Sequence, residues 1–417
     1  MTKSPNVLTL NRVLTLPVIT LYGIGTMVGA GIYGLIGKVI YLSGNFTPYA
    51  FLLSSFIALF TSLSYGELSS HLPRSAGEAA YVKEGFRSTL IATFIGWLTI
   101  TTGVVSSSAI LSSVVDYFQL FYDVDRYLIK TVIVSIVVFF AAGGVHWSVG
   151  IACFFTLIEI GGLVYIIYLG GSETVSHFVN NPKDLLPPAS LSDIKTLFLG
   201  SFLAFYAFIG FEDMVNMAEE VKSPRKTLHR AILLALLVSS ILYILVAYVA
   251  VSAVMVEELT KSETPLADLV AIKGAGAKWA ISFIGLISLI NGGFVQTIMA
   301  SRVLYGMSRQ RMAPKIYSYI YPKTKTPLVA TVTVGLITWV LMVVIPHVTL
   351  AKITTFIILI IFSAINLSLI FIKRRNQKEK GVFRVPMFVP YAGLILNLSL
   401  LAIKLMYLVM PHLFTTE

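Results

Sequence analysis

Long apolar runs separated by short polar connections dominate the chain. Most runs reach or approach the roughly 20 residues that a helix needs to cross the hydrocarbon core of a bilayer. The pattern predicts about 11 transmembrane helices, at 15–39, 47–70, 89–117, 128–145, 147–170, 195–218, 229–256, 276–303, 328–346, 349–372 and 387–408. We therefore expect an all-α membrane protein that forms a single integral domain over residues 1–417.

Glycines crowd into the first of these spans. They are Gly23, Gly25, Gly29, Gly31, Gly34 and Gly37. Each glycine costs a helix interior about 1 kcal/mol relative to alanine. Small residues also let helices pack closely, but a helix interruption at membrane depth is tolerated where the bared backbone lines a protected cavity. The sequence therefore predicts a non-helical break near Gly29–Gly31, with close packing as the alternative.

A second interruption follows in the sixth span, where Gly210 is followed at once by Glu212 and Asp213. Gly210 comes 181 residues after Gly29, and the two spans begin about 180 residues apart. Matched interruptions in two halves of a chain are typical of transporters built from inverted repeats. We expect five helices in 15–170, five in 195–372 and one extra helix at 387–408, with both breaks in one cavity.

Several sequence blocks resemble the amino acid–polyamine–organocation (APC) superfamily, in particular its cationic amino acid transporters and basic amino acid–polyamine antiporters. The blocks are Gly25–Tyr33, Tyr65–Leu68, Pro73–Tyr81, Phe208–Glu212, Ala218–Thr227 and Ala300–Met307. The resemblance implies a LeuT-type 5+5 inverted repeat with broken helices 1 and 6, alternating access and an amino-acid-like substrate. Two departures are His229, where relatives often have proline, and the lack of a twelfth span.

Charge predicts the orientation. The chain has 56% hydrophobic and only 12% charged residues, far below the charged content of soluble domains. The N-terminus and the even-to-odd connections hold 21 of the 31 basic residues, whereas the acidic pairs Asp123/Asp125 and Glu257/Glu258 fall on the other side. The positive-inside rule then makes the N-terminus cytoplasmic, and a multi-pass protein of the cell membrane is expected.

Other function classes find little support. The net charge of +11 is explained by topology, so no nucleic-acid partner is expected. Cys153 is the single cysteine and the histidines are scattered, so we expect no metal site and no cofactor. We find no nucleophile paired with a base inside the spans, which argues against an intramembrane enzyme, and no repeated polar rings, which argues against a channel.

The breaks supply the candidate substrate site. Free N–H groups at the start of an outer half-helix suit a carboxylate, and free carbonyls at the end of the other half-helix suit an ammonium. The resemblance supports both roles and implies that Tyr206 is an aromatic lid. The candidate substrate-binding residues are Thr26, Met27, Gly29, Ala30, Gly31, Tyr206, Phe208, Ile209 and Gly210.

Four polar residues inside the spans are candidates for coupling or gating. Glu159 lies deep in the fifth span, where a charged carboxylate is costly unless it faces a cavity or binds a proton. The resemblance places it within one residue of a lysine used by proton-coupled relatives. Glu212 caps the second break or switches conformation, and Ser288 and Asn291 complete an ion or proton site with the carbonyls of Gly25 and Met27.

Several points stay open. Asp213 is expected to be solvated, and Glu67 is expected to pair with Arg74 in a gate or loop. A polyamine or other amine is the alternative substrate. The sequence leaves the identity of the amino acid, coupling to protons or sodium, symport or exchange, and the oligomeric state undetermined.

Overall fold

The computed structural model describes residues 10–119, 124–252, 259–260, 262, 264–375 and 381–409. Within these residues the chain is helical apart from short connections and two isolated β-bridges. Three of the acidic residues that were used to predict the orientation, Asp123, Glu257 and Glu258, lie outside the described residues. So do three of the basic residues counted for the other side, Lys3, Lys378 and Lys380.

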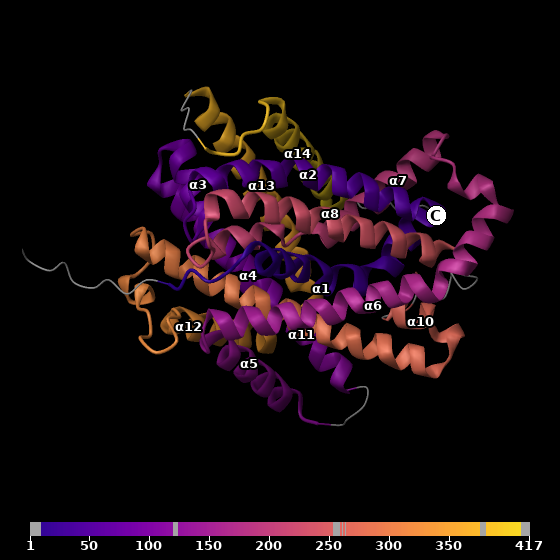
Figure 1. Ribbon diagram of the computed structural model, residues 1–417, viewed down its shortest axis with the longest axis horizontal. Helices are drawn as coiled ribbons and strands as arrows, with labels where there is room; N and C mark the ends of the chain where they lie inside the picture. The colour runs from indigo at the N-terminus through magenta and orange to yellow at the C-terminus, as the bar shows by residue number, and fades with distance from the viewer. Residues whose placement is uncertain are drawn as a thin grey trace, which may run out of the picture.

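A helical segment occupies each predicted span (Figure 1). The long helices are α1 (Leu16–Ser43), α2 (Thr47–His71), α4 (Thr89–Gln119), α5 (Arg126–Ala142), α6 (Val145–Asn180), α7 (Leu191–Ala204), α8 (Pro224–Val251), α11 (Ala275–Arg309), α12 (Leu328–Val344), α13 (His347–Arg374) and α14 (Phe388–Val409). Short helices are α3 (Gly77–Phe86), α10 (Pro265–Leu269) and the 3₁₀ turns η1 (Gly44–Phe46), η2 (Pro182–Leu185), η3 (Phe205–Phe208), η4 (Phe211–Met217), η5 (Ala271–Lys273) and η6 (Lys315–Ser318).

Helix α6 is longer than its apolar run predicts, because it continues from residue 170 to Asn180. Beyond the apolar run, the Thr174 hydroxyl lies 2.8 Å from that of Ser252, and the ring of Phe178 packs edge-on against Tyr248. These contacts to the end of α8 hold an extension that the hydropathy pattern does not show. The connection to α7 is correspondingly short, and it ends in a capping box formed by Ser190 and the first turn of α7.

Seven helical segments among the described residues are long and apolar enough to cross a membrane, and three shorter apolar helices accompany them. Large apolar side chains lie on the outer surface, including Leu90 (83% exposed), Phe139 (73%) and Trp147 (70%). A soluble protein rarely exposes apolar surface on this scale. The chain is therefore a multi-pass membrane protein.

Helix α1 runs through the middle of the bundle, where it packs against α6, α7, α8 and α11. In Figure 1 the helix α3 lies at the left end of the bundle, whereas α10 and the connection from α6 to α7 lie at the right end. The two ends are the two sides of the protein along its helix axes. We refer to them below as the α3 end and the α10 end.

Both predicted interruptions are present, one inside α1 and the other between α7 and η4. In α1, Gly29 alone departs from helical geometry, with φ −36° and ψ −109°. In the other segment, α7 gives way to η3, Ile209 is extended, and Gly210 has φ 129° before η4 begins. A φ near +130° is open to glycine and strained for other residues, which explains why glycine stands at this position.

Candidate functional site

The two breaks are in direct contact. The Thr26 hydroxyl lies 2.8 Å from the carbonyl oxygen of Gly210 and 2.7 Å from that of Gly23. A Cβ atom added to Gly210 would come within 2.8 Å of the Thr26 carbonyl group. The breaks therefore meet backbone to backbone, with no room for a side chain at Gly210.

Close packing continues along the second half of α1. A Cβ on Gly31 would lie 2.9 Å from the Cα of Ala207 in η3. On the other side, the Ser288 hydroxyl of α11 donates to the Gly29 carbonyl over 2.8 Å. Ser288 was expected to work with the carbonyls of Gly25 and Met27, but the structure bonds it to the carbonyl that the kink at Gly29 exposes.

The remaining candidate substrate residues surround this contact. Met27 and Phe208 are fully buried, and the Phe208 ring packs against Phe51 and Tyr243. Tyr206 is half-buried, and its carbonyl accepts a bond from the Ile209 N–H over 3.2 Å. Ala30 continues the helix after Gly29, and its side chain lies outside the described part of the chain.

Two carbonyl oxygens at the second break stay available. The Ala207 carbonyl accepts from the Tyr243 hydroxyl over 3.1 Å, and that of Gly210 accepts from Thr26. Among the described residues, no hydrogen bond reaches the carbonyls of Phe208 and Ile209. Carbonyl oxygens of this kind are ready acceptors for a cationic group.

Glu159 lies beside the kinked part of α1, fully buried in α6. Its Oε1 accepts from the Asn291 side-chain amide over 2.9 Å, and that amide also lies 3.4 Å from the Thr156 hydroxyl. A Cβ on Gly25 would overlap Thr156. Helix α1 therefore packs directly against the polar side chains that α6 and α11 contribute. The structure thus brings together Glu159, Asn291 and Gly25, three residues that the sequence analysis named.

This group contains acceptors that lack a donor. Glu159 Oε2 and Asn291 Oδ1 are buried and have no hydrogen-bond partner among the described residues. The hydroxyl of Tyr33 donates to the Glu159 backbone carbonyl over 2.7 Å and not to the carboxyl. A buried acceptor without a donor costs about 1–3 kcal/mol, and a proton on the carboxyl would supply the missing donor.

The carboxyls after the second break are buried. Glu212 Oε2 accepts from the Gly210 N–H over 2.8 Å, so it caps the free backbone group there. Asp213 was expected to be solvated, which is wrong: it is 2% exposed, and its Oδ2 accepts from the Gln296 side-chain amide of α11 over 2.7 Å. Gln296 turns this carboxyl inward, and its place inside an apolar span was the signal in the sequence.

Further polar contacts tie η4 to the α3 end, and the sequence analysis missed them. The Asn216 side chain accepts from the Gly77 N–H over 3.0 Å and donates to Glu78 Oε1 over 3.3 Å. Beyond η4, Glu220 accepts the N–H groups of Val13 and Leu14 on its carbonyl oxygen. The segment from Gly210 to Glu220 is thus fastened to α3 and to the start of the chain.

A buried ion pair lies at the same end. The Arg302 guanidinium of α11 and the Glu220 carboxyl are both fully buried, with nitrogen–oxygen distances of 3.4 and 3.5 Å. Burial raises the pKa of Glu220, and Arg302 acts in the opposite direction. The pair joins α11 to the segment after η4 where that segment meets the start of the chain.

We expect Arg302→Met to lower the free energy of unfolding by about 3–5 kcal/mol, because it leaves the Glu220 carboxyl buried without a cation. The double variant Arg302→Met/Glu220→Leu should recover most of this loss. Thermal unfolding of the purified protein in detergent measures both. A single variant as stable as the wild type would show that the ion pair contributes nothing to the free energy of unfolding.

Glu67 also has a partner that the sequence did not predict. Its carboxylate lies 2.8 Å from Nζ of Lys373 on α13, not beside the exposed Arg74. The Val385 N–H donates to the same carboxylate over 2.7 Å. The ion pair therefore connects α2 to α13 and to the segment that precedes α14, a pairing across 306 residues.

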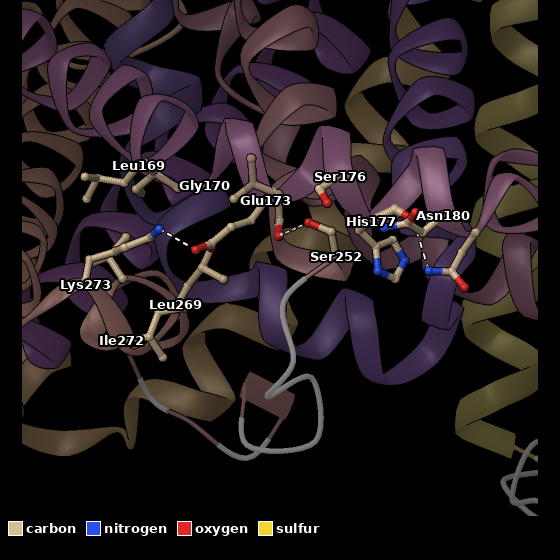
Figure 2. Close-up of a pocket in the computed structure, with 14 residues that line it drawn as sticks. Leu169, Gly170, Glu173, Ser176, His177, Asn180, Ser252, Leu269, Ile272 and Lys273 are labelled. Atoms are coloured by element: carbon tan, nitrogen blue, oxygen red, sulfur yellow. Dashed lines mark hydrogen bonds and ion pairs between the residues drawn. The ribbon is translucent and has the colours of Figure 1, made fainter.

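A cavity of about 460 Å³ lies away from the breaks, at the α10 end. Figure 2 shows its lining, where Glu173 points toward Lys273 and His177 lies near Asn180. None of the break residues lines it. This cavity is separate from the breaks, which contact each other through Thr26 and Gly210, and one cavity shared by both breaks stays a prediction.

Known proteins resemble the chain along its length. The amino acid permease family matches residues 14–417. The branched-chain amino acid permease BcaP of Bacillus subtilis (strain 168) is 26% identical over 392 residues, covering 88% of this chain and 82% of that protein. The methylthioribose transporter of the same organism is 26% identical over 409 residues, covering 93% of this chain and 86% of that protein.

A plant relative is longer. The vacuolar cationic amino acid transporter 4 of Arabidopsis thaliana is 27% identical over 340 residues, which cover 76% of this chain. The matched residues cover 55% of that transporter, so the chain spans about half of its length. The family match covers nearly the whole chain, and the chain belongs to the amino acid permeases of the APC superfamily.

Proposed function

We propose that the protein is a secondary active transporter that moves amino acids across the cell membrane by alternating access. The observation that carries the proposal is the contact between two interrupted helices at Thr26 and Gly210. Interrupted helices that meet inside a bundle are the usual place of a substrate site in transporters. Membership of a family of amino acid permeases supports the same function.

The proposed architecture is a LeuT-type 5+5 inverted repeat with about 11 transmembrane helices. The repeats run from α1 to α6 and from α7 to α13, with the short α3 and α10 outside the count and α14 as the extra helix. The basic residues near the α3 end favour a cytoplasmic N-terminus under the positive-inside rule. The α3 end is then the cytoplasmic side and the α10 end the outer side.

The substrate binds between the breaks. Backbone N–H groups after the kink at Gly29 receive the carboxylate, helped by the positive end of the helix dipole. The carbonyls of Phe208 and Ile209 receive the ammonium. Since Thr26 contacts Gly210 directly, α1 and η3 separate to admit substrate, and Tyr206 covers it afterwards.

Uptake of a labelled amino-acid panel into proteoliposomes tests the proposal. Amino acids should be taken up, and amines without an α-carboxylate, such as putrescine and agmatine, should compete about 10- to 100-fold more weakly. The reason is that they lose charge-assisted hydrogen bonds of about 1.5–3 kcal/mol. The measurement is the concentration of each compound that halves uptake, with and without proton or sodium gradients.

Two outcomes would change the conclusion. If agmatine competes as well as arginine, the carboxylate site is wrong and an amine carrier replaces the amino acid transporter. If no compound on the panel enters, while unlabelled methylthioribose does, the substrate class follows the relative of that name.

A further inference from the structure

Three buried carboxyls gather between the second break and α3. Glu78 lies in the first turn of α3, and Glu212 and Asp213 lie in the first turn of η4. Their exposed fractions are 1%, 4% and 2%. The Asn216 amide of η4 donates to Glu78 Oε1 over 3.3 Å, so η4 and its two carboxyls lie against the start of α3, and the three form one group.

The hydrogen-bond partners of this group are neutral. Glu78 receives the Asn216 amide, Asp213 receives the Gln296 amide, and Glu212 receives a backbone N–H. None of the ion pairs among the described residues includes a member of the group. The carboxyls are thus buried without a counter-charge in contact.

Two basic side chains near this group, Arg302 and Arg375, bind other partners. Arg302 of α11 pairs with Glu220. Arg375, directly after α13, donates to the backbone carbonyls of Glu84 and Gly85 at the far end of α3. Helix α4, which also packs against α3, has no ionisable side chain before Asp116 near its opposite end. Helices α2 and α8, which pack against η4, carry His71, Arg225, Lys226, His229 and Arg230. None of the ion pairs among the described residues joins a basic side chain of α2, α8, α11 or α13 to the group.

Buried polar atoms without a hydrogen-bond partner indicate that these carboxyls carry protons. Glu78 Oε2 and the hydroxyls of Tyr65 and Tyr81 are buried without a hydrogen-bond partner among the described residues. The two tyrosine rings pack edge to face, with 6.3 Å between their centroids. Three buried anions at this site would be very costly, whereas protonated carboxyls are neutral and add donors.

Burial raises the pKa of Glu78 to about 8, and Glu212 adds to the effect while the amide of Asn216 opposes it. The sign follows directly. A carboxyl whose pKa is raised on folding stabilises the closed arrangement while it is protonated. That stabilisation is lost as the pH rises through about 8.

We propose that Glu78, Glu212 and Asp213 form a second proton-binding site, at the α3 end, which holds protons while η4 is closed against α3 and α11. This inference rests on the proposed function, because it assigns the site a place in transport. When η4 moves away, the Asn216–Glu78 contact breaks and water reaches the carboxyls. Each acid then loses its proton to water and becomes a carboxylate, and re-closure requires that a proton returns.

Glu78→Gln tests the assignment in proteoliposomes, since it mimics the protonated acid and keeps the shape. Net uptake by the wild type should depend on the pH at the α3 side, by up to about tenfold per pH unit because one titrating group changes its occupancy by that factor. The variant should reduce this dependence, because Glu212 and Asp213 still titrate, while exchange of amino acid for amino acid at constant pH continues. Glu84→Gln on the same helix, outside the group, is the matched control and should keep the wild-type profile.

A spectroscopic readout separates a proton site from a packing role. The infrared C=O band of a protonated carboxyl should be present in the wild type at neutral pH, weaken in Glu78→Gln, and return in Glu78→Asp. A variant that keeps both this band and the wild-type pH profile would overturn the inference. Failure of the wild type to transport any amino acid would instead overturn the proposed function, and the infrared result would still report on the site.

Discussion

Replacing Gly31 with alanine is expected to reduce amino acid uptake strongly, whereas the same change at Gly34, one turn along the same helix, leaves uptake intact. A Cβ on Gly31 would lie 2.9 Å from the Cα of Ala207, a backbone atom that cannot rotate away. A Cβ on Gly34 meets nothing within 4 Å. The first change forces α1 and η3 apart at the substrate site, and the second only adds helix propensity.

The comparison is informative because both variants carry the same side chain in the same helix. Overpacking of this kind costs about 1–3 kcal/mol, so Gly31→Ala should insert and remain helical while its uptake falls about 5- to 150-fold. Initial uptake rates at equal amounts of reconstituted protein measure the difference. Wild-type uptake by Gly31→Ala would mean that α1 and η3 need not pack this closely at any step of transport.

The interruptions were predictable because glycine is costly in a helix and Gly210 needs a positive φ. Hydropathy also predicted the positions of the long helices, since each must present about 20 apolar residues. It could not predict that α6 runs to Asn180, because that extension depends on contacts with Ser252 and Tyr248 far along the chain. Nor could it predict which atoms bring the two breaks into contact, namely the Thr26 hydroxyl and the Gly210 carbonyl.

Part of the candidate site could also be predicted from the sequence. Glu159 and Asn291 stood out as polar residues inside apolar spans, and the structure joins them by a hydrogen bond. Gln296 also stands out as a polar residue inside an apolar span, but its pairing with Asp213, and that of Asn216 with Glu78, was not accessible across 83 and 138 residues. Pairs that far apart are set by tertiary packing, and a single sequence gives no pattern for them.

We expect Glu159→Gln to remove the dependence of uptake on the pH of the outer side while leaving substrate binding largely intact. Glu159 Oε2 and Asn291 Oδ1 are buried acceptors without a partner among the described residues. In the closed arrangement the protonated carboxyl is therefore the favoured form, because the proton supplies a donor and removes a buried charge. Glutamine keeps a neutral, hydrogen-bonding side chain of the same size at this position.

The sign of the pH effect follows from this assignment. As the outer pH falls, more of the wild-type protein carries the proton that the closed arrangement requires, so uptake rises. The glutamine variant is fixed in the neutral form and should show a flat profile. Glu173→Gln is the matched control: it lies on the same helix but is 56% exposed by its side chain and pairs with Lys273, and its profile should follow the wild type.

Sodium coupling makes the opposite prediction, which the same proteoliposomes can measure. A sodium site needs several oxygen ligands around the ion, and the Asn291 amide N–H already occupies Glu159 Oε1. Uptake by the wild type should therefore proceed with a proton gradient in the absence of sodium. If uptake requires sodium at every pH, or if Glu159→Gln keeps the wild-type pH profile, Glu159 holds α6 against α11 and takes no part in coupling.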